Sequence, residues 1–235
     1  MKQYPMITIS RQYGTDGHQI AKLLAEKLGL PFYDKDLITI ASKETRFDEK
    51  AFEAAEQTAT TALGYVLSNR SNRSIYGMPL NDQLFMVQSG VIRTIADRGP
   101  AVIVGRCADY VLSGYKPTID IFLQASKEAR KNTVVEREHI SPKEAENQIA
   151  RMDKARATYY NYYTDRKWSD LKNYDIALNV SHLTPEEAAG LLATFINQVV
   201  EKTGLVEEEA QEEKAAKKSG SFYKRLGAAA PCSGP

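Results

Sequence analysis

The chain has 235 residues, of which 43% are hydrophobic and 26% are charged, and its formal net charge is +1. This composition is typical of a globular protein and excludes a globally disordered chain. The near-zero charge excludes a bulk attraction to nucleic acid or to anionic membranes, so we expect neither as a partner and any anion site must be local. The length is enough for one sizeable α/β domain, or for a core domain that carries an insertion.

The cysteines and the apolar runs indicate the compartment. Cys107 and Cys232 form neither a disulfide framework nor a zinc motif, which favours a reducing environment. The N-terminus has no long apolar core after Lys2, so we expect no signal peptide. No run approaches the roughly 18 apolar residues of a membrane span. We therefore expect a cytoplasmic protein.

Short apolar runs bounded by turn residues predict five β-strands. They cover residues 6–9, 31–33, 101–104, 118–123 and 174–180. Helical patterns lie between them: Ile20, Leu24 and Leu28 recur at helical spacing, and Gly29 follows as a C-terminal cap would. Strands that alternate with helices predict an α/β fold with a mostly parallel sheet and helices on both faces.

Two helical stretches exceed a minimal strand–helix repeat. Residues 36–98 show no convincing strand and are interrupted by a polar loop at 70–79, and residues 141–170 form a second insertion that is rich in Arg, Tyr and Asp. Such insertions suggest moving parts over a ligand site, although helices also fill cores. Residues 1–204 are expected to form one domain. Residues 205–235 are expected to be a charged, disordered tail, or alternatively a docking segment around Phe222 to Arg225.

The segment ITISRQYGTDGHQIA, residues 7–21, has the layout of a phosphate-binding loop: an apolar strand, a loop with two glycines, and a helix. The free N–H groups and the dipole at a helix N-terminus attract phosphate, and glycines let the backbone approach it closely. A standard P-loop adds a lysine and a hydroxyl residue, and both are absent here. Arg11 is a nearby cation that could reach back over the loop. The simpler alternative is a tight turn between strand and helix. The predicted phosphate-binding residues are Gly14, Thr15, Asp16, Gly17, His18 and Gln19.

Taken together, the motifs resemble the cytidylate kinase-like family, a divergent branch of the P-loop nucleoside monophosphate kinases. The resemblance extends from about residue 5 to about residue 200. The matching blocks, in order, are ITISRQYGTDGHQIA at 7–21, LPFYDKDL at 30–37, VIVGRCAD at 102–109, MDKAR at 152–156, YYNYYT at 159–164 and NYDI at 173–176.

The resemblance implies a P-loop three-layer fold with a five-stranded parallel sheet, and transfer of the γ-phosphoryl group of ATP to a nucleoside monophosphate, CMP or dCMP first, with Mg²⁺. It places acceptor binding in residues 36–98 and a lid in residues 141–170. The sequence departs from ordinary cytidylate kinases at His18, which stands where they carry the P-loop lysine. A neutral histidine offers one N–H donor and no fixed charge, so arginines elsewhere must supply the positive charge.

Phosphoryl transfer relies on cations that converge from several elements. Arg106 directly follows a predicted strand and is assigned to the acceptor monophosphate; alternatively it caps the strand end. Arg130 and Arg137 lie two turns apart on one helical face where the lid begins. Together with Arg11, they are predicted to be catalytic cations.

Arg151 and Arg156 flank Asp153 in the second insertion and are predicted to act from the lid, with Asp153 among the substrate-binding residues. Asp153 and Arg156 could instead pair with each other at i, i+3 on a solvated face. The tyrosines at 159, 160, 162 and 163 favour packing over base stacking.

Asp34 ends the second predicted strand, and Lys35 follows it. The carboxylate could hold Mg²⁺ through water or orient the acceptor phosphate, which makes Asp34 a predicted catalytic, substrate and metal residue, with Lys35 on the substrate side. The alternative for Asp34 is an N-cap of the next helix. Asp16 is unfavourable in a phosphate loop unless a metal ion or Arg11 offsets its charge.

Two alternatives to a nucleotide kinase stay open. The missing lysine motivates a nucleotide-binding regulatory protein without efficient catalysis, and the absence of a recognisable cytosine motif in 36–98 motivates a kinase for another small molecule. The sequence leaves the oligomeric state open.

Overall fold

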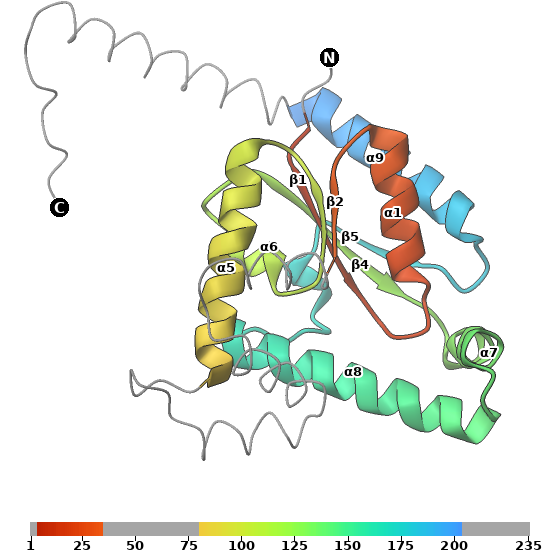
Figure 1. Ribbon diagram of the computed structural model, residues 1–235. Coiled ribbons are helices and arrows are strands. Elements are labelled where there is room, and N and C mark those ends of the chain that lie inside the picture. Colours follow the sequence, from red (N-terminus) through yellow and green to blue (C-terminus); the bar gives the residue numbers. More distant parts are fainter. Residues whose placement is uncertain (1–3, 35–79, 204–235) are drawn as a thin grey trace, which may run out of the picture.

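The computed structural model describes residues 4–34 and 80–203 (Figure 1). Several predicted features therefore lie outside the described residues: Lys35, most of the insertion at 36–98 with its polar loop, and the tail at 205–235 with Cys232.

Five strands form one sheet in the order β2-β3-β1-β4-β5, and every neighbouring pair is parallel. They are β1 (Met6–Arg11), β2 (Phe32–Tyr33), β3 (Val102–Val104), β4 (Thr118–Gln124) and β5 (Ile176–Asn179). All five predicted strands are confirmed. The last is shorter than predicted, because residues Leu171–Asn173 form a 3-10 turn and Tyr174 packs into a buried aromatic cluster before the strand begins.

Helices cover both faces of this sheet and complete a three-layer α/β fold (Figure 1). They are α1 (Gly17–Leu28), α5 (Leu80–Arg98), α6 (Ala108–Leu112), α7 (Lys127–Glu138), α8 (Pro142–Thr164) and α9 (Pro185–Thr203). None of the described helices is long and apolar enough to cross a membrane.

The alternation of side chains along β1 divides the core between the two faces. Ile7 and Ile9 pack with residues of α1 and α9 in one cluster. Met6 packs with Ile92 of α5 and with residues of α6 in a second cluster. Both faces of the strand are therefore buried, as expected for a parallel sheet.

Local signals in the sequence set the helix ends near the site. Ser126 caps α7 by accepting a hydrogen bond from the backbone N–H of Ala129 at 3.1 Å. Ser141 and Glu144 form a capping box at the start of α8, with Pro142 in the first turn. The second predicted insertion, residues 141–170, thus consists mainly of one continuous helix of 23 residues, which ends at Thr164.

Because the strands are parallel, their carboxyl ends meet at one edge of the sheet. The loop after β1, the Gly105–Cys107 turn after β3 and the start of α7 after β4 all lie at this edge, and α8 runs across it (Figure 1). The fold therefore brings together most of the residues that the sequence predicts for phosphate chemistry.

Candidate functional site

Glycines shape the loop between β1 and α1. Gly14 has φ +83°, and a Cβ there would lie 2.8 Å from the carbonyl oxygen of Arg130. A Cβ on Gly17 would lie 2.8 Å from Cγ of Arg11. These contacts show that the loop is packed tightly against α7 on one side and against the stem of Arg11 on the other. The loop is more constrained than a simple tight turn requires.

The loop is also held from within. The buried hydroxyl of Thr15 donates a hydrogen bond to the carbonyl of Gln12 at 2.9 Å. The Gln12 side chain accepts one from the backbone N–H of Ala125 at 3.1 Å, which ties the loop to the end of β4. The Thr15 hydroxyl therefore supports the loop conformation, and its predicted contact with phosphate stays a prediction.

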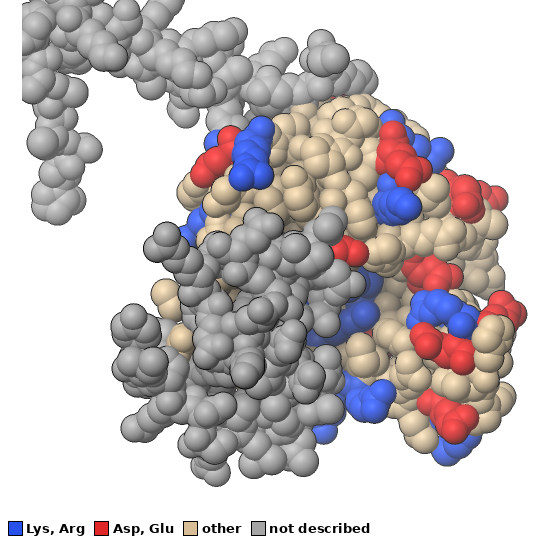
Figure 2. Space-filling view, in the orientation of Figure 1, with Lys and Arg blue, Asp and Glu red and all other residues tan. Residues whose placement is uncertain are grey.

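A cavity of about 380 Å³, here called the loop cavity, opens over this loop. Arginines from α7 and α8 complete its wall, and Lys and Arg side chains gather beside a hollow on the face shown in Figure 2. The cavity brings together nine of the predicted site residues with Gln12 and Tyr13: Arg11, Gly14, Thr15, Asp16, Gly17, His18, Gln19, Arg137 and Arg156.

Arg11 lies close to two other arginines of the site, Arg106 and Arg156. Burial, followed by the positive charges of Arg156 and Arg106, lowers the pKa of Arg11 to about 9, and the carboxylate of Asp34 opposes that shift. The guanidinium still stays charged at neutral pH. Three guanidinium groups this close together, opposed by the carboxylate of Asp34, form a site that favours an anion.

A smaller pocket of about 60 Å³, here called the arginine–aromatic pocket, adjoins the loop cavity. Arg11 and Arg156 line both spaces. The smaller pocket also contains Arg106, which follows β3 with φ +57°. Its remaining lining residues are Ser10, Gly105, Cys107, Tyr159, Tyr160 and Trp168.

His18, at the position of the missing lysine, contacts a carboxylate. Its Nε2 lies 2.8 Å from Oδ2 of Asp34, and its ring meets Phe32 edge-on. The His18 side chain is 60% exposed, whereas that of Asp34 is 17% exposed. His18 thus links the start of α1 to the end of β2. The predicted metal and acceptor roles of Asp34 stay predictions.

Arg130 and Asp153 lie behind the loop and line neither of the two spaces described above. Arg130 is buried and donates to Oδ2 of Asp153 at 2.5 Å and to the carbonyl of Tyr13 at 3.3 Å. Oδ1 of Asp153 accepts the backbone N–H of Tyr13 at 2.8 Å. The i, i+3 pair with Arg156 does not form, since Arg156 donates instead to the carbonyl of Arg11 at 2.8 Å.

The surroundings of two other predicted site residues, Asp16 and Arg151, differ from those predicted. Asp16 is offset by Arg137, whose Nη1 lies 3.2 Å from its carboxylate, rather than by Arg11. Arg151 is exposed on α8 and lines neither the loop cavity nor the arginine–aromatic pocket. Direct phosphate contacts by Arg130 and Arg151 therefore stay predictions.

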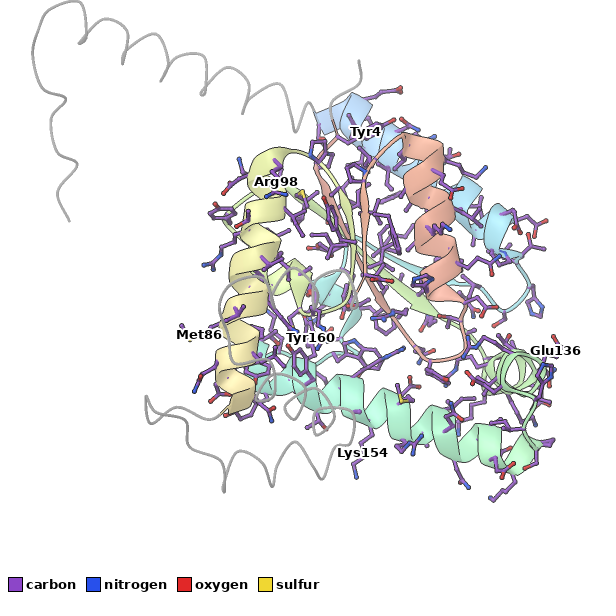
Figure 3. All side chains as sticks on the ribbon, viewed as in Figure 1. Tyr4, Met86, Arg98, Glu136, Lys154 and Tyr160 are labelled. Carbon is purple, nitrogen blue, oxygen red and sulfur yellow. The ribbon has the colours of Figure 1, made fainter. Side chains whose placement is uncertain are left out.

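The tyrosines of α8 are divided between packing and the site. Phe85 of α5 stacks on Tyr163 with ring centroids 4.0 Å apart, as the packing interpretation predicts. Tyr160 instead lies on the sheet side of α8, opposite Lys154 (Figure 3), and donates to buried Asp109 at 2.6 Å. Burial raises the pKa of Tyr160 and that of Asp109.

Sequence reasoning missed Tyr13, Gly105 and Trp168 as parts of the site. Gly105 has φ +77°, and a Cβ there would lie 2.5 Å from Nη1 of Arg11, so the guanidinium rests directly on this glycine. The position of the Gly105–Arg106 pair directly after a strand could have indicated Gly105 as a site residue as well as Arg106. Tyr13 and Trp168 carried no comparable signal, because their positions depend on α7 and α8.

Comparison with known proteins gives consistent results. The sequence profile of the cytidylate kinase-like family matches residues 6–182. The chain is 28% identical over 118 residues to a cytidylate kinase of Methanopyrus kandleri, a match that covers 47% of this chain and 61% of that protein. It is 21% identical over 203 residues to a cytidylate kinase of Sulfurisphaera tokodaii, which covers 84% of this chain and 98% of that protein.

A solved structure matches over a similar length. The crystal structure of an uncharacterized protein from Eubacterium ventriosum has 28% sequence identity and a TM-score of 0.63, and the match covers 82% of this chain and 98% of that one. The parallel five-stranded sheet, the glycine loop that opens α1 and the family match over residues 6–182 agree. This chain has a P-loop kinase fold and belongs to the cytidylate kinase-like family.

Proposed function

We propose that this protein is an ATP-dependent phosphotransferase that transfers the γ-phosphoryl group to a nucleoside monophosphate, with CMP or dCMP as the first candidates. One observation carries the proposal: Arg11 and Arg156 line both the loop cavity and the arginine–aromatic pocket. A phosphoryl group passing between a donor and an acceptor needs cations at the boundary between their two sites.

The loop cavity suits the donor. The backbone at the start of α1 supplies unpaired N–H groups and the positive end of the helix dipole, and Arg137 adds a side-chain cation at the rim. Arg11 takes the place of the missing lysine in this assignment. Its stem packs against Gly17 and its guanidinium against Gly105, so the charge is held in position before ATP binds.

The residues present are compatible with Mg²⁺. Within residues 4–34 and 80–203, no three His, Cys, Asp or Glu side chains are grouped to hold a metal ion by themselves. Mg²⁺ in kinases is bound by one or two carboxylates together with substrate phosphates and water. Asp34 is the carboxylate we assign, since it is partly exposed and close enough to affect the pKa of Arg11. When bound, the ion would neutralise charge on the phosphate oxygens.

The arginine–aromatic pocket suits the acceptor. Arg106 supplies a bidentate donor for its phosphate, and Tyr159, Tyr160 and Trp168 supply an aromatic wall. The acceptor phosphate is itself the nucleophile and is largely ionised at neutral pH, so the reaction needs no strong general base. We assign residues 141–170, which include α8, as the lid that excludes water when both substrates are bound.

The names of the relatives support cytidylate as the first acceptor to test, at 28% and 21% identity. The test is ADP release by the full chain, coupled to an indicator reaction, with ATP and a panel of nucleoside monophosphates, sugars and cofactors. Turnover with CMP or dCMP is expected. Turnover with a non-nucleotide only would overturn the acceptor assignment. ATP binding without turnover of any acceptor would overturn the enzyme assignment and favour a regulatory protein, which the pairing of His18 with Asp34 would then explain.

The assignment of Arg106 to the acceptor predicts a selective defect. Arg106→Ala should lower acceptor-dependent turnover by about 100-fold, because a charged bidentate contact is lost, and should change ATP affinity by less than about threefold. Steady-state kinetics with varied acceptor and ATP titration by calorimetry give the two quantities. Equal losses in both would place Arg106 on the donor instead.

A further inference from the structure

Tyr13 lies where the glycine loop, α7 and α8 meet. Its backbone N–H donates to Asp153 at 2.8 Å, and its carbonyl accepts from Arg130 at 3.3 Å. Its hydroxyl donates to Glu138 at 2.9 Å and accepts from the side-chain amide of Gln148 at 2.8 Å. The backbone and the side chain of Tyr13 therefore both join the loop to the two helices.

The ring of Tyr13 contacts two of the arginines that line the loop cavity. The guanidinium carbon of Arg137 lies 5.2 Å from the ring centroid, and that of Arg156 lies 5.4 Å from it. Both distances are within the range of about 6 Å in which a cation is attracted by the face of an aromatic ring. Tyr13 itself lines the same cavity.

Such a contact has a purpose in this site. The charges of Arg156 and Arg106 act against that of Arg11, and those of Arg137 and Arg130 act against that of Arg156, so repulsion favours conformations in which these long side chains turn to solvent. Arg137 is also paired with Asp16 and with Glu138, each at 3.2 Å. Arg156 arises from α8 and Arg137 from α7, so no single backbone element fixes their relative positions. An aromatic ring that contacts both restrains them without neutralising either charge.

We propose that Tyr13 is a positioning residue of the phosphate site, whose ring holds Arg137 and Arg156 over the glycine loop so that a polyphosphate meets preorganised cations. The inference rests on the proposed function only in taking the anion to be the phosphate chain of the donor. The ring acts through the arginines, and its hydroxyl bonds to Glu138 and Gln148 serve the joint between the helices.

Two substitutions separate these parts of the side chain. Tyr13 packs against a cluster of Val134, Ala145 and Ile149, and Leu would keep that apolar contact while it removes the aromatic face. Tyr13→Phe keeps the face and loses the hydroxyl, with its bonds to Glu138 and Gln148 and its contact with Arg137. The probe is inorganic tripolyphosphate, which carries the charge of the ATP phosphates without a base or sugar, and its affinity for the full chain is measured by calorimetry.

Tyr13→Leu should weaken tripolyphosphate binding by about tenfold, and Tyr13→Phe by less than about twofold. In an Arg137→Gln background the effect of Tyr13→Leu should shrink, because one of its two arginine partners is gone. If Tyr13→Leu fails to fold, Tyr13→Met supplies the same comparison with a more adaptable side chain. Thermal unfolding of each variant without ligand accompanies the titrations.

The inference is overturned by equal losses in the Phe and Leu variants, by unchanged affinity in a folded Leu variant, or by failure of the parent chain to bind tripolyphosphate. Its failure is distinguishable from that of the proposed function, because the titration requires neither acceptor nor turnover. A chain without kinase activity whose Tyr13→Leu variant selectively loses tripolyphosphate would support the inference and overturn the enzyme assignment.

Discussion

In the proposed site Arg11 takes the place of the lysine of a standard P-loop, and His18, which stands at that position, pairs with Asp34. Arg11 is at the end of β1, yet its side chain crosses from Gly17 at the start of α1 to Gly105 after β3. His18 contacts Asp34 and is largely exposed. At the scale of single residues, the site therefore depends on two glycines that leave room for one arginine.

Gly105→Ala tests this dependence. The new Cβ would lie 2.5 Å from Nη1 of Arg11, so the guanidinium must move away from the boundary between the loop cavity and the arginine–aromatic pocket. We expect kcat/KM to fall by about 30-fold or more, since misplaced catalytic groups are costly. Steady-state kinetics with ATP and the best acceptor measure the effect.

Gly29→Ala is the matched control. Gly29 has φ +68° beside the +77° of Gly105, so both substitutions introduce similar backbone strain, but a Cβ on Gly29 would meet nothing within 4 Å. Gly29→Ala should lower stability and leave kcat/KM within about twofold. Similar kinetic losses in both variants would show that strain alone, and not Arg11, explains the result.

At the scale of elements, α8 supports the phosphate loop directly. Asp153 accepts the N–H of Tyr13, Arg156 donates to the carbonyl of Arg11, and Arg130 of α7 completes the contact with Asp153. The helix expected to be a lid is therefore joined to the loop through several specific hydrogen bonds. A movement of α8 would change the loop itself.

Asp153→Asn should show how much this joint contributes to stability. It leaves the buried guanidinium of Arg130 without a carboxylate, and we expect the free energy of unfolding to fall by roughly 1–3 kcal/mol. Urea unfolding measures the change. Arg151→Gln, on the exposed side of the same helix, should stay within about 0.5 kcal/mol of the parent chain. Equal effects of the two substitutions would contradict the proposal that the contacts of Asp153 stabilise the fold.

The middle of β4 carries a carboxyl group that weakens the fold at neutral pH. Burial raises the pKa of Asp120 to about 6, with Asp109 and Asp175 adding to the shift and the hydrogen bond from Thr8 opposing it. The folded state therefore binds this proton more tightly than the unfolded state does. Stability from this group is greatest at low pH and is lost as pH rises through about 4 to 6.

Asp120→Asn replaces the ionisable carboxyl group and should therefore remove the loss of stability that its ionisation causes at neutral pH. The variant should be more stable than the parent chain by up to roughly 3 kcal/mol at pH 7.5, and its advantage should shrink to under about 1 kcal/mol at pH 4. Urea titrations of both proteins at the two pH values give the comparison. An advantage of the same size at both values would mean that packing, and not ionisation, distinguishes Asn from Asp.

At the scale of the whole molecule, a nearly neutral chain concentrates positive charge at one edge of its sheet. The net charge is +1, yet Arg156 and Arg106 lie close enough to Arg11 to add to the lowering of its pKa that burial causes. The parallel topology causes this concentration, because it gathers the ends of β1 and β3 and the helix α8 at the same edge. An anion that binds at this edge therefore reduces the electrostatic repulsion among these arginines in the folded protein.

The chain should therefore be stabilised by polyanions. A ligand that binds only the folded state adds about 2.7 kcal/mol to the free energy of unfolding at 100 times its Kd. Thermal unfolding should shift upward by several degrees with ATP and with tripolyphosphate, and not with adenosine, which lacks phosphate. A shift with adenosine equal to that with ATP would indicate that the base, rather than the arginine cluster, dominates binding.

The strands, most described helices, the glycine loop and the family could be predicted from the amino-acid sequence. These features follow from hydrophobic periodicity, caps and short motifs, which act between residues near in the chain. The sequence also predicted Arg11 and Arg106, since residues after parallel strands meet at one edge of the sheet, and it predicted Arg137 and Arg156 as arginines of the lid. All four line the cavities of the site, and their catalytic roles stay predictions.

Which charged groups line the cavities and which pair with each other could be read only from the folded structure. Asp153 contacts Tyr13 and Arg130 rather than its helical neighbour Arg156, and His18 contacts Asp34. Asp153 and Tyr13 are separated by 140 residues, and their contact exists because α7 and α8 are laid across the sheet edge. Charge pairing has no periodicity that a sequence displays, so the choice among possible partners depends on how distant elements pack.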